Sequence, residues 1–478
     1  MPILLYFHKL TTGIPKILSL MILTFLVTIS QTANIAIADE TTENPIDVKS
    51  FSITSEFPKG IWLDVEVVSD NKITEISSRL KIGQTKGTTY NYLCLEKENK
   101  NPESWRCQDL VPDNNIKATL FWRTDTSGKY IPQGTLIEIS FEIKDEKGNV
   151  LTTPPTNFIY LDPNFNWENI SEGPVTLNYH GPVKSRAQKI LDAIVETLEK
   201  VGPVLGANID DPIMVTMYNN GKEMIDAQPP QSSTQGRELI TEGQAFSNFG
   251  TLHLIGGDRN SIGTASHEVT HILVHRAGEG VFRKVPTWLN EGLAEWANID
   301  PAMSYDIALE FAVATDRVPI ITKGVTMPGK PEDAIIFYGA SRSIVTYLIS
   351  EYGAKKMYSL LSELKSDIKL EEAIQTVYGF DIVYLENTWR NKIGAEKYID
   401  NKSSLTIPTA EPIKTIKPFS LNDDSAITRG GGEIKSEDKN TSTSSGCNLF
   451  SLNDNSNADL SILGLLIFLI LFKSKRNN

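Results

Sequence analysis

Short runs of alternating hydrophobic and polar residues fill the chain between residues 48 and 153. Residues 61–67 and 137–143 show the pattern most clearly, with an aliphatic or aromatic side chain at every second position. A period of two is typical of a strand that buries one face. Turn-forming sequences, such as 130–134 and 145–149, separate the runs. The pattern predicts about seven strands, at 48–57, 61–68, 73–82, 89–95, 117–124, 135–144 and 149–153.

From about residue 175 the hydrophobic positions follow helical spacing. Apolar residues from Ile190 to Val201 recur every three or four positions, and Gly202-Pro203 predicts the end of that helix. Apolar runs predict two strands, at 213–218 and 251–255. We expect the second of these strands to lie at the edge of its sheet. The sequence predicts a helix at 262–278 and a second helix that opens at 286. Three or four more helices should follow, and these include 333–352, 354–366 and 381–394. This layout predicts an α+β domain over 175–398 that is mostly helical in its second half.

We therefore expect a multidomain chain in which an all-β sandwich at 39–160 precedes the α+β domain. The number and spacing of its strands resemble an immunoglobulin or fibronectin type III domain. Cys94 and Cys107 flank a polar loop in this region, and outside the cytoplasm we expect them to form a disulfide. Two unpaired thiols are the alternative.

The N-terminal end has the order of a secretory signal peptide. Lys9 and Lys16 precede an apolar run at 17–29, and the small residues that follow end at Ala38. The sequence predicts a signal peptide at 1–38. An uncleaved membrane helix is the alternative, although the apolar run is short for a span.

The C-terminal end contains a polar linker and an apolar segment. Residues 399–457 have little to bury and predict a disordered stalk. Residues 458–478 combine an uncharged apolar run with a basic tail and predict a membrane or sorting segment. Together with Cys447, this end resembles the sorting signals of secreted bacterial proteins, in which the tail is removed and the cysteine region becomes the anchor. A simple tail anchor is the alternative.

Composition narrows the function classes. The chain has 478 residues and a formal net charge of −13, so it offers no basic stripe for nucleic acid. Its three cysteines exclude a disulfide-dense scaffold, and none lies in the central region where it could bind a metal.

The strongest chemical signal is the motif His267-Glu268-Val269-Thr270-His271. On a helix the two histidines lie one turn apart, so both imidazoles leave the same face and can bind one zinc ion. Glu268 beside that face is suited to accept a proton from a zinc-activated water. Chance would give roughly 0.01 such motifs in a chain of this composition.

A third ligand is expected from the sequence that follows. Glu291 and Glu295 both lie within 288–295, and from the residues alone either carboxylate could reach the metal. His275 is on the same helical stripe as His267, but about 12 Å along the axis, too far for both to bind one ion.

These two motifs resemble those of the gluzincin metallopeptidases, which have thermolysin-like catalytic domains. The resemblance covers about 180–395. It implies three zinc ligands: His267, His271 and Glu291. It also implies that Glu268 is the general base and that Glu295 orients a ligand histidine. The Asn-Glu-Gly context favours Glu291 as the ligand, because Gly292 permits close helix approach.

The same resemblance calls for a donor to the oxyanion of the reaction, which related gluzincins supply as a tyrosine or histidine. Tyr338 is our candidate, with Tyr347 and His253 behind it, and ordinary packing is the alternative for each. The Gly-x-Met-Glu-Asn signature of gluzincin aminopeptidases is absent, so endopeptidase activity is expected.

Two functions from different classes follow. The first is a secreted or surface-anchored zinc metallopeptidase that hydrolyses polypeptides, exported to the cell envelope or surface or released, and held through its C-terminal segment. The second is a surface binding or adhesion protein with a non-catalytic metal domain. Glu268 favours the enzyme, because a structural zinc site needs no general base and is closed by four protein ligands.

Overall fold

The computed structural model describes residues 44–96, 100–126, 129–228, 242–323 and 326–399, and the backbone strand Gly446–Cys447. The predicted signal peptide, nearly all of the predicted stalk and the segment at 458–478 lie outside the described residues. In the part of the chain that is described, no helix has both the length and the apolar character needed to cross a membrane.

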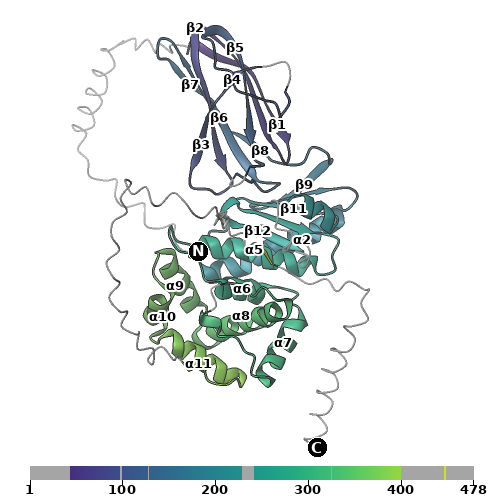
Figure 1. Ribbon diagram of the computed structural model, residues 1–478, viewed down its shortest axis with the longest axis vertical. Coiled ribbons are helices and arrows are strands. Elements are labelled where there is room, and N and C mark those ends of the chain that lie inside the picture. Colours follow the sequence, from purple (N-terminus) through teal and green to yellow (C-terminus); the bar gives the residue numbers. More distant parts are fainter. Residues whose placement is uncertain are drawn as a thin grey trace, which may run out of the picture. The chain divides into compact units, whose positions relative to one another are not determined.

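The first sheet is built from eight strands of the described N-terminal region (Figure 1). They are β1 (Ile46–Glu56), β2 (Gly60–Ile82), β3 (Thr88–Tyr92), β4 (Cys94–Leu95), β5 (Asp113–Arg123), β6 (Leu136–Asp145), β7 (Val150–Thr152) and β8 (Thr156–Ile159). Their alternating burial follows the period of two in the sequence, clearest in β6. The immunoglobulin- or fibronectin-like topology stays a prediction.

Strand β2 joins two strands that the pattern predicted separately. Its first part pairs with β1 and β5, and its second part, from Ile73, pairs with β3 and β6. The register shifts between Val68 and Ile73, so an irregularity, rather than a turn, separates the two parts. Inward-facing side chains such as Ile61, Ile76 and Phe141 are buried and form the core of this domain.

The second sheet has the order β14-β12-β13-β11-β10-β9 among the described strands. Its strands are β9 (Trp167–Glu172), β10 (Val175–His180), β11 (Ile213–Tyr218), β12 (Gly243–Phe246), β13 (Thr251–Ile255) and β14 (Gly446–Cys447). Strands β10, β11 and β13 run parallel, and β9, β12 and β14 are antiparallel to their neighbours.

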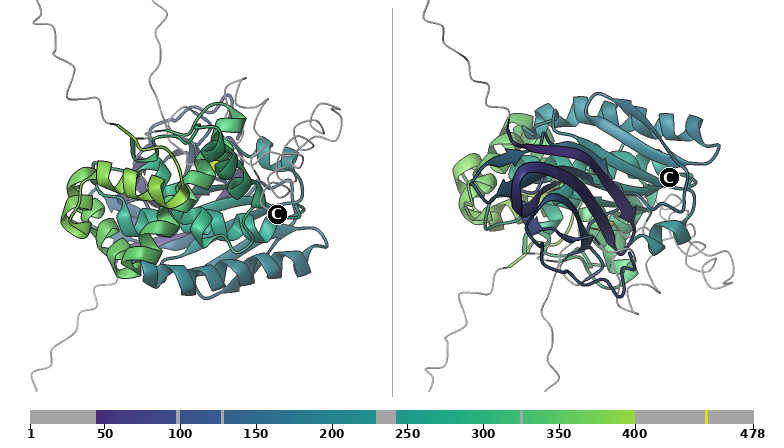
Figure 2. Two further views of the ribbon diagram at one scale, coloured as in Figure 1. Left: turned by 90° about the horizontal axis from the view of Figure 1, so that it is seen from below. Right: turned by 90° about the horizontal axis from the view of Figure 1, so that it is seen from above.

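Helices cover one face of the second sheet and continue into a helical second half, coloured green in Figures 1 and 2. They are α2 (Lys184–Leu205), α3 (Gly221–Asp226), α5 (Ser261–Gly278), α6 (Thr287–Ala297), α7 (Met303–Ala314), α8 (Pro331–Tyr352), α9 (Ala354–Lys365), α10 (Leu370–Tyr378) and α11 (Ile382–Ile393), with 3₁₀ turns η1 (Ser247–Phe249) and η2 (Ile321–Lys323). Leu177, Val215 and Leu252 of the sheet share one buried core with α2, α5 and α6.

The other face of the second sheet contacts the first domain, which lies in the same compact unit. Side chains that alternate with the core positions carry these contacts. Tyr218 donates a hydrogen bond to Oε1 of Gln133, and His253 Nε2 lies 2.7 Å from the Gln133 carbonyl oxygen. Gly134 is required here, because a Cβ atom would lie 2.1 Å from the Thr216 hydroxyl.

Two sequence predictions about this domain are wrong. Helix α2 does not stop at Gly202-Pro203 but continues to Leu205, where Gly206 adopts the left-handed conformation. Pro203 cannot donate the usual hydrogen bond to the Glu199 carbonyl oxygen, and the helix ends within one further turn, where the N–H of Gly206 donates to the Gly202 carbonyl oxygen. Strand β13 is not the edge, because β12 pairs with its outer side. The bounds of the other predicted elements lie within a few residues of those described. No bounds were predicted for six helices and strands of this domain: β9, β10, β12, α3, α7 and α10.

Candidate metal centre

His267 and His271 lie in the middle of α5, a helix that is buried on almost every side. Sheet residues and neighbouring helices surround it, which explains its run of small and aliphatic residues. The two imidazoles leave the same face one turn apart, and their Nε2 atoms are 3.2 Å from each other. Both rings are buried.

Glu291 comes from the next helix, α6. Its Oε2 atom lies 3.6 Å from Nε2 of His267 and 3.5 Å from Nε2 of His271. Ligand atoms of the three residues all lie within 4.8 Å of one another. Gly292 lets α6 approach α8, since a Cβ atom there would lie 2.4 Å from the Ser341 carbonyl oxygen.

Glu295 lies one turn further along α6 and contacts the other nitrogen of His267. Its Oε1 atom is 2.8 Å from Nδ1, while Nε2 of the same ring faces Glu291. The two carboxylates, which the residues alone left open and the family resemblance separated, therefore occupy different positions. Glu291 completes the cluster of three, and Glu295 fixes the ring orientation of His267 from behind.

Asn290 plays the matching part for His271 and was not identified from the sequence. Its Oδ1 atom lies 3.0 Å from Nδ1 of His271. An amide oxygen at this position favours the tautomer that carries its proton on Nδ1 and leaves Nε2 free to bind a metal. The sequence signal that could have identified Asn290 is its position directly before Glu291. Its contact with His271 depends on the packing of α5 against α6.

Charge around the two histidines differs. Burial lowers the pKa of both rings, but three nearby carboxylates, Glu295 foremost, outweigh it at His267 and raise its pKa well above the usual value. At His271 burial prevails and the pKa is lowered. A cation bound between the rings would be attracted by the same carboxylates that favour a proton there.

The side chain of Glu268, from α5, lies against the backbone of strand β12. A Cβ atom on Gly243 would be 2.7 Å from Cγ of Glu268 and 2.5 Å from Cγ2 of Thr264. Only glycine allows the backbone of β12 to pass this close to the side chain of Glu268. The carboxylate is buried beside the metal cluster and beside the backbone of β12.

Tyr338 of α8 lies beside the ring of His267. The two ring centroids are 6.5 Å apart, and Tyr338 stacks on Tyr305 of α7 with centroids 5.3 Å apart. Gly339 permits this contact by lying against the Tyr305 carbonyl oxygen. Tyr338 is therefore near the cluster and its ring is held in place.

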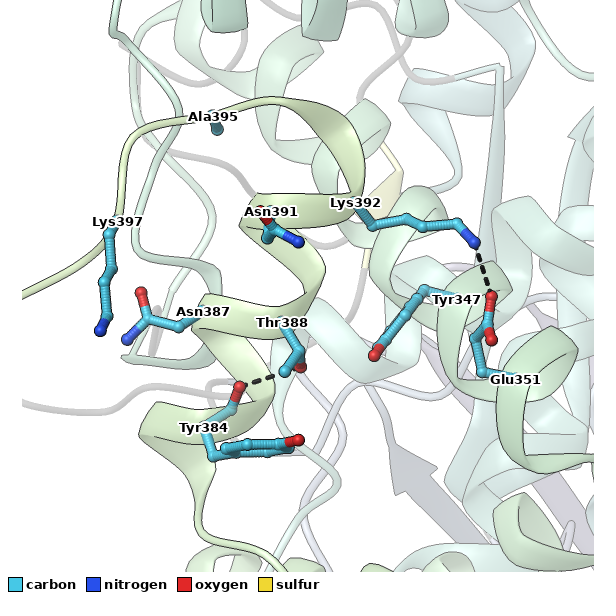
Figure 3. Close-up of a pocket in the computed structure, with 9 residues that line it drawn as sticks. All are labelled: Tyr347, Glu351, Tyr384, Asn387, Thr388, Asn391, Lys392, Ala395 and Lys397. Carbon is cyan, nitrogen blue, oxygen red and sulfur yellow. Dashed lines mark hydrogen bonds and ion pairs between the residues drawn. The ribbon is translucent and has the colours of Figure 1, made fainter.

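The structure places the other two candidate oxyanion donors elsewhere. The ring nitrogens of His253 face Gln133 and Gln228, and burial lowers its pKa to about 4. Tyr347 lines a cavity of about 600 Å³ between α8 and α11, where Figure 3 shows it pointing toward Thr388. None of the three metal-ligand candidates lines that cavity.

His275, Cys94 and Cys107 are also outside the cluster. His275 Nδ1 lies 2.9 Å from Oε2 of Glu279 at the end of α5. Cys94 and Cys107 form a disulfide in the first domain, with Cα atoms 5.4 Å apart.

The cluster fits a zinc ion. Two imidazole nitrogens and one carboxylate oxygen are the protein ligands of catalytic zinc sites, which leave a further position for substrate or water. The two outer partners, Glu295 and Asn290, complete the arrangement that orients such ligands. A calcium or magnesium site would be built from oxygen ligands instead.

Comparison with known proteins agrees with this class of site. Residues 192–395 match the Peptidase MA superfamily, and this match supports a zinc peptidase. No curated protein is significantly similar in sequence.

Among solved structures, an M1 zinc metallopeptidase from Deinococcus radiodurans is 11% identical with a TM-score of 0.30, covering 78% of this chain and 97% of that one. A bromine derivative of BhCBM56 is 10% identical with a TM-score of 0.14, covering 24% of this chain and 98% of that one. Scores this low assign no function.

Proposed function

We propose that the chain is a zinc-dependent peptidase in which His267, His271 and Glu291 bind the metal. The single observation that carries the proposal is the convergence of these three buried side chains within 4.8 Å, with Glu268 adjacent in the same helix. A structural zinc site would use four protein ligands, and the described residues gather three. The adhesion alternative gives no reason for a buried Glu268.

Each residue has a defined task. A zinc ion bound there supplies a Lewis acid that polarises a carbonyl group and lowers the pKa of water. Glu268 accepts the proton of the attacking water and later donates it to the leaving amine. Tyr338 donates a hydrogen bond to the oxygen that becomes negatively charged. Glu295 and Asn290 hold the ligand imidazoles in orientation.

The substrate is an extended polypeptide that adds to strand β12. Backbone groups on the outer side of β12 bind a peptide by strand addition, in place of the chain's own Gly446–Cys447. The antiparallel pairing of Gly446–Cys447 with Gly243 and Gln244 illustrates this geometry. Because the strand runs past Glu268, a peptide bound along it brings an internal bond to the base. We therefore propose endopeptidase activity.

A peptide-library digestion tests the proposal. Purified full chain should cleave internal bonds, lose activity on removal of metal by a chelator and recover it with zinc. His267→Ala should lose the metal, while the control His275→Ala, on the same helix but outside the cluster, should retain it. Hydrolysis by metal-free protein would refute the zinc mechanism, and release of single N-terminal residues would refute the endopeptidase assignment.

We also propose export followed by retention at the cell envelope or surface. The signal-like sequence at 1–38, the apolar and basic-tailed segment at 458–478 and the Cys94–Cys107 disulfide support this location. Fractionation of cells that express the full chain and a version ending at Asn440 tests it. The full chain should remain with the envelope and the shorter one should be released. Recovery of both in the cytosol would refute it.

A further inference from the structure

Two exposed tyrosines project from β3, an end strand of the first sheet. Tyr90 is 61% exposed and Tyr92 is 68% exposed. Residues two apart on a strand point to the same side, so the rings lie about 7 Å apart on one face. The intervening Asn91 and the preceding Thr89 are less exposed and face the other way. Burial in the fold therefore does not account for either ring.

Arg79 of β2 holds the ring of Tyr90. The two residues are directly opposite in the pairing of β2 with β3. The guanidinium carbon lies 5.5 Å from the centre of the ring, and the same guanidinium forms an ion pair with Glu142 of β6. A cation over one ring face and an anchored guanidinium fix the aromatic surface before any ligand arrives.

The rest of this sheet face is polar but balanced in charge. Ser77 lies opposite Tyr92, and Ser140 lies opposite Arg79. The cations here lie within ion-pair distance of carboxylates on neighbouring strands. The pairs are Arg79–Glu142, Lys81–Glu138 and Lys144–Glu75. The face thus combines two aromatic rings with many hydrogen-bonding groups and no net charge.

We propose that this tyrosine face, made of Tyr90, Tyr92 and the paired side chains beside them, binds an uncharged polysaccharide. A sugar ring has an apolar C–H face that packs on an aromatic ring and a rim of hydroxyls that bond to charged and polar side chains. A balanced face gives no long-range attraction to a charged polymer, and the chain as a whole repels polyanions. An apolar protein partner would leave the paired charges poorly solvated.

The tyrosine face is separate from the metal centre. None of its residues comes from the metal-binding helices, and its three strands, β2, β3 and β6, belong to the first sheet. Binding there would place the peptidase domain on a polysaccharide surface without altering its chemistry. The proposal therefore stands or falls independently of the peptidase activity.

Co-sedimentation of the full chain with insoluble cellulose, chitin and a β-1,3-glucan tests the proposal. The wild-type protein should bind at least one of the three. The Tyr90→Ala/Tyr92→Ala double variant should bind about tenfold more weakly or worse, because two stacking surfaces are lost. Tyr384→Ala is the matched control, since Tyr384 is also exposed, at 53%, but lies on α11, and it should bind as the wild type does.

The contrary outcomes are distinct. Failure of the wild-type protein to bind any of the three, or equal binding by the double variant, overturns the proposal. Tighter binding to alginate or heparin than to any uncharged polysaccharide also overturns it. Circular dichroism and zinc content should be unchanged in the double variant. If it does not fold, the single variants Tyr90→Ala and Tyr92→Ala, each removing one exposed ring, give the same comparison.

Discussion

Gly243 of β12 and Glu268 of α5 are in direct contact across the space between that strand and the metal helix. A Cβ atom on Gly243 would lie 2.7 Å from Cγ of Glu268 and 3.1 Å from its Oε1 atom. The position of the proposed base therefore depends on a residue that has no side chain. The absence of a side chain at Gly243 also determines how close a peptide bound along β12 can come to Glu268.

Replacing Gly243 with alanine should displace the base but leave the metal. Zinc binding depends on residues of α5 and α6, so Gly243→Ala should retain zinc. A shift of roughly 1 Å in a catalytic group can reduce turnover about a hundredfold. Steady-state kinetics and metal analysis of the same preparation measure both. Gly87→Ala is the control, because a Cβ atom there meets nothing within 4 Å. Unchanged kcat in Gly243→Ala would contradict the contact.

Glu295→Gln should weaken zinc binding while keeping all three ligands. The carboxylate lies 2.8 Å from Nδ1 of His267, and partners of this kind typically contribute a factor of about 10–100 in metal affinity. Competition with a fluorescent zinc chelator measures the change. Glu279→Gln, which alters the partner of His275 on the same helix, should leave the affinity as it was. Equal affinities in all three proteins would exclude a positioning role for Glu295.

Stability should depend on pH through Glu242. Burial, and then the charge of Asp258, raises the pKa of its carboxyl group from 4.5 to about 7. The folded protein therefore binds this proton more tightly than the unfolded chain. The group destabilises the folded state progressively as the pH rises from the unfolded pKa to the folded pKa, and by a constant amount above it.

The variant Glu242→Gln should remove this effect. Its Tm relative to wild type should increase between about pH 5 and about pH 8. The exposed Glu199→Gln is the control and should show no such trend. Thermal unfolding at several pH values measures the difference. A difference between Glu242→Gln and wild type that is constant with pH would contradict the raised pKa.

Much of the metal centre could be predicted from local sequence, because helical spacing alone places His267 and His271 on one face. Helical spacing could not choose between Glu291 and Glu295, which lie one turn apart on α6. The family resemblance favoured Glu291 as the ligand, and the packing of α6 against α5 places the two carboxylates differently. Resemblance supplied Tyr338, whose position depends on stacking against Tyr305.

Strand β12, which lies beside Glu268, was missed for a different reason. Gly243–Phe246 has four residues, all buried, and so has no alternation that a pattern could reveal. In the first domain the alternation in β2 was clear, but a strand that bends without a turn looks in sequence like two strands. Local sequence patterns therefore predicted most helices and strands, but they did not predict which strands are continuous or which strands pair.

The most direct test of the peptidase mechanism is the turnover of zinc-loaded Glu268→Gln. The amide has the size of the carboxylate but cannot accept the proton, so zinc should stay bound at the wild-type stoichiometry. General base catalysis typically contributes a factor of about 10²–10⁴, and we expect kcat to fall by roughly that amount on a peptide that the wild-type protein cleaves. A zinc-loaded Glu268→Gln protein that cleaves this peptide at the wild-type rate would contradict the mechanism.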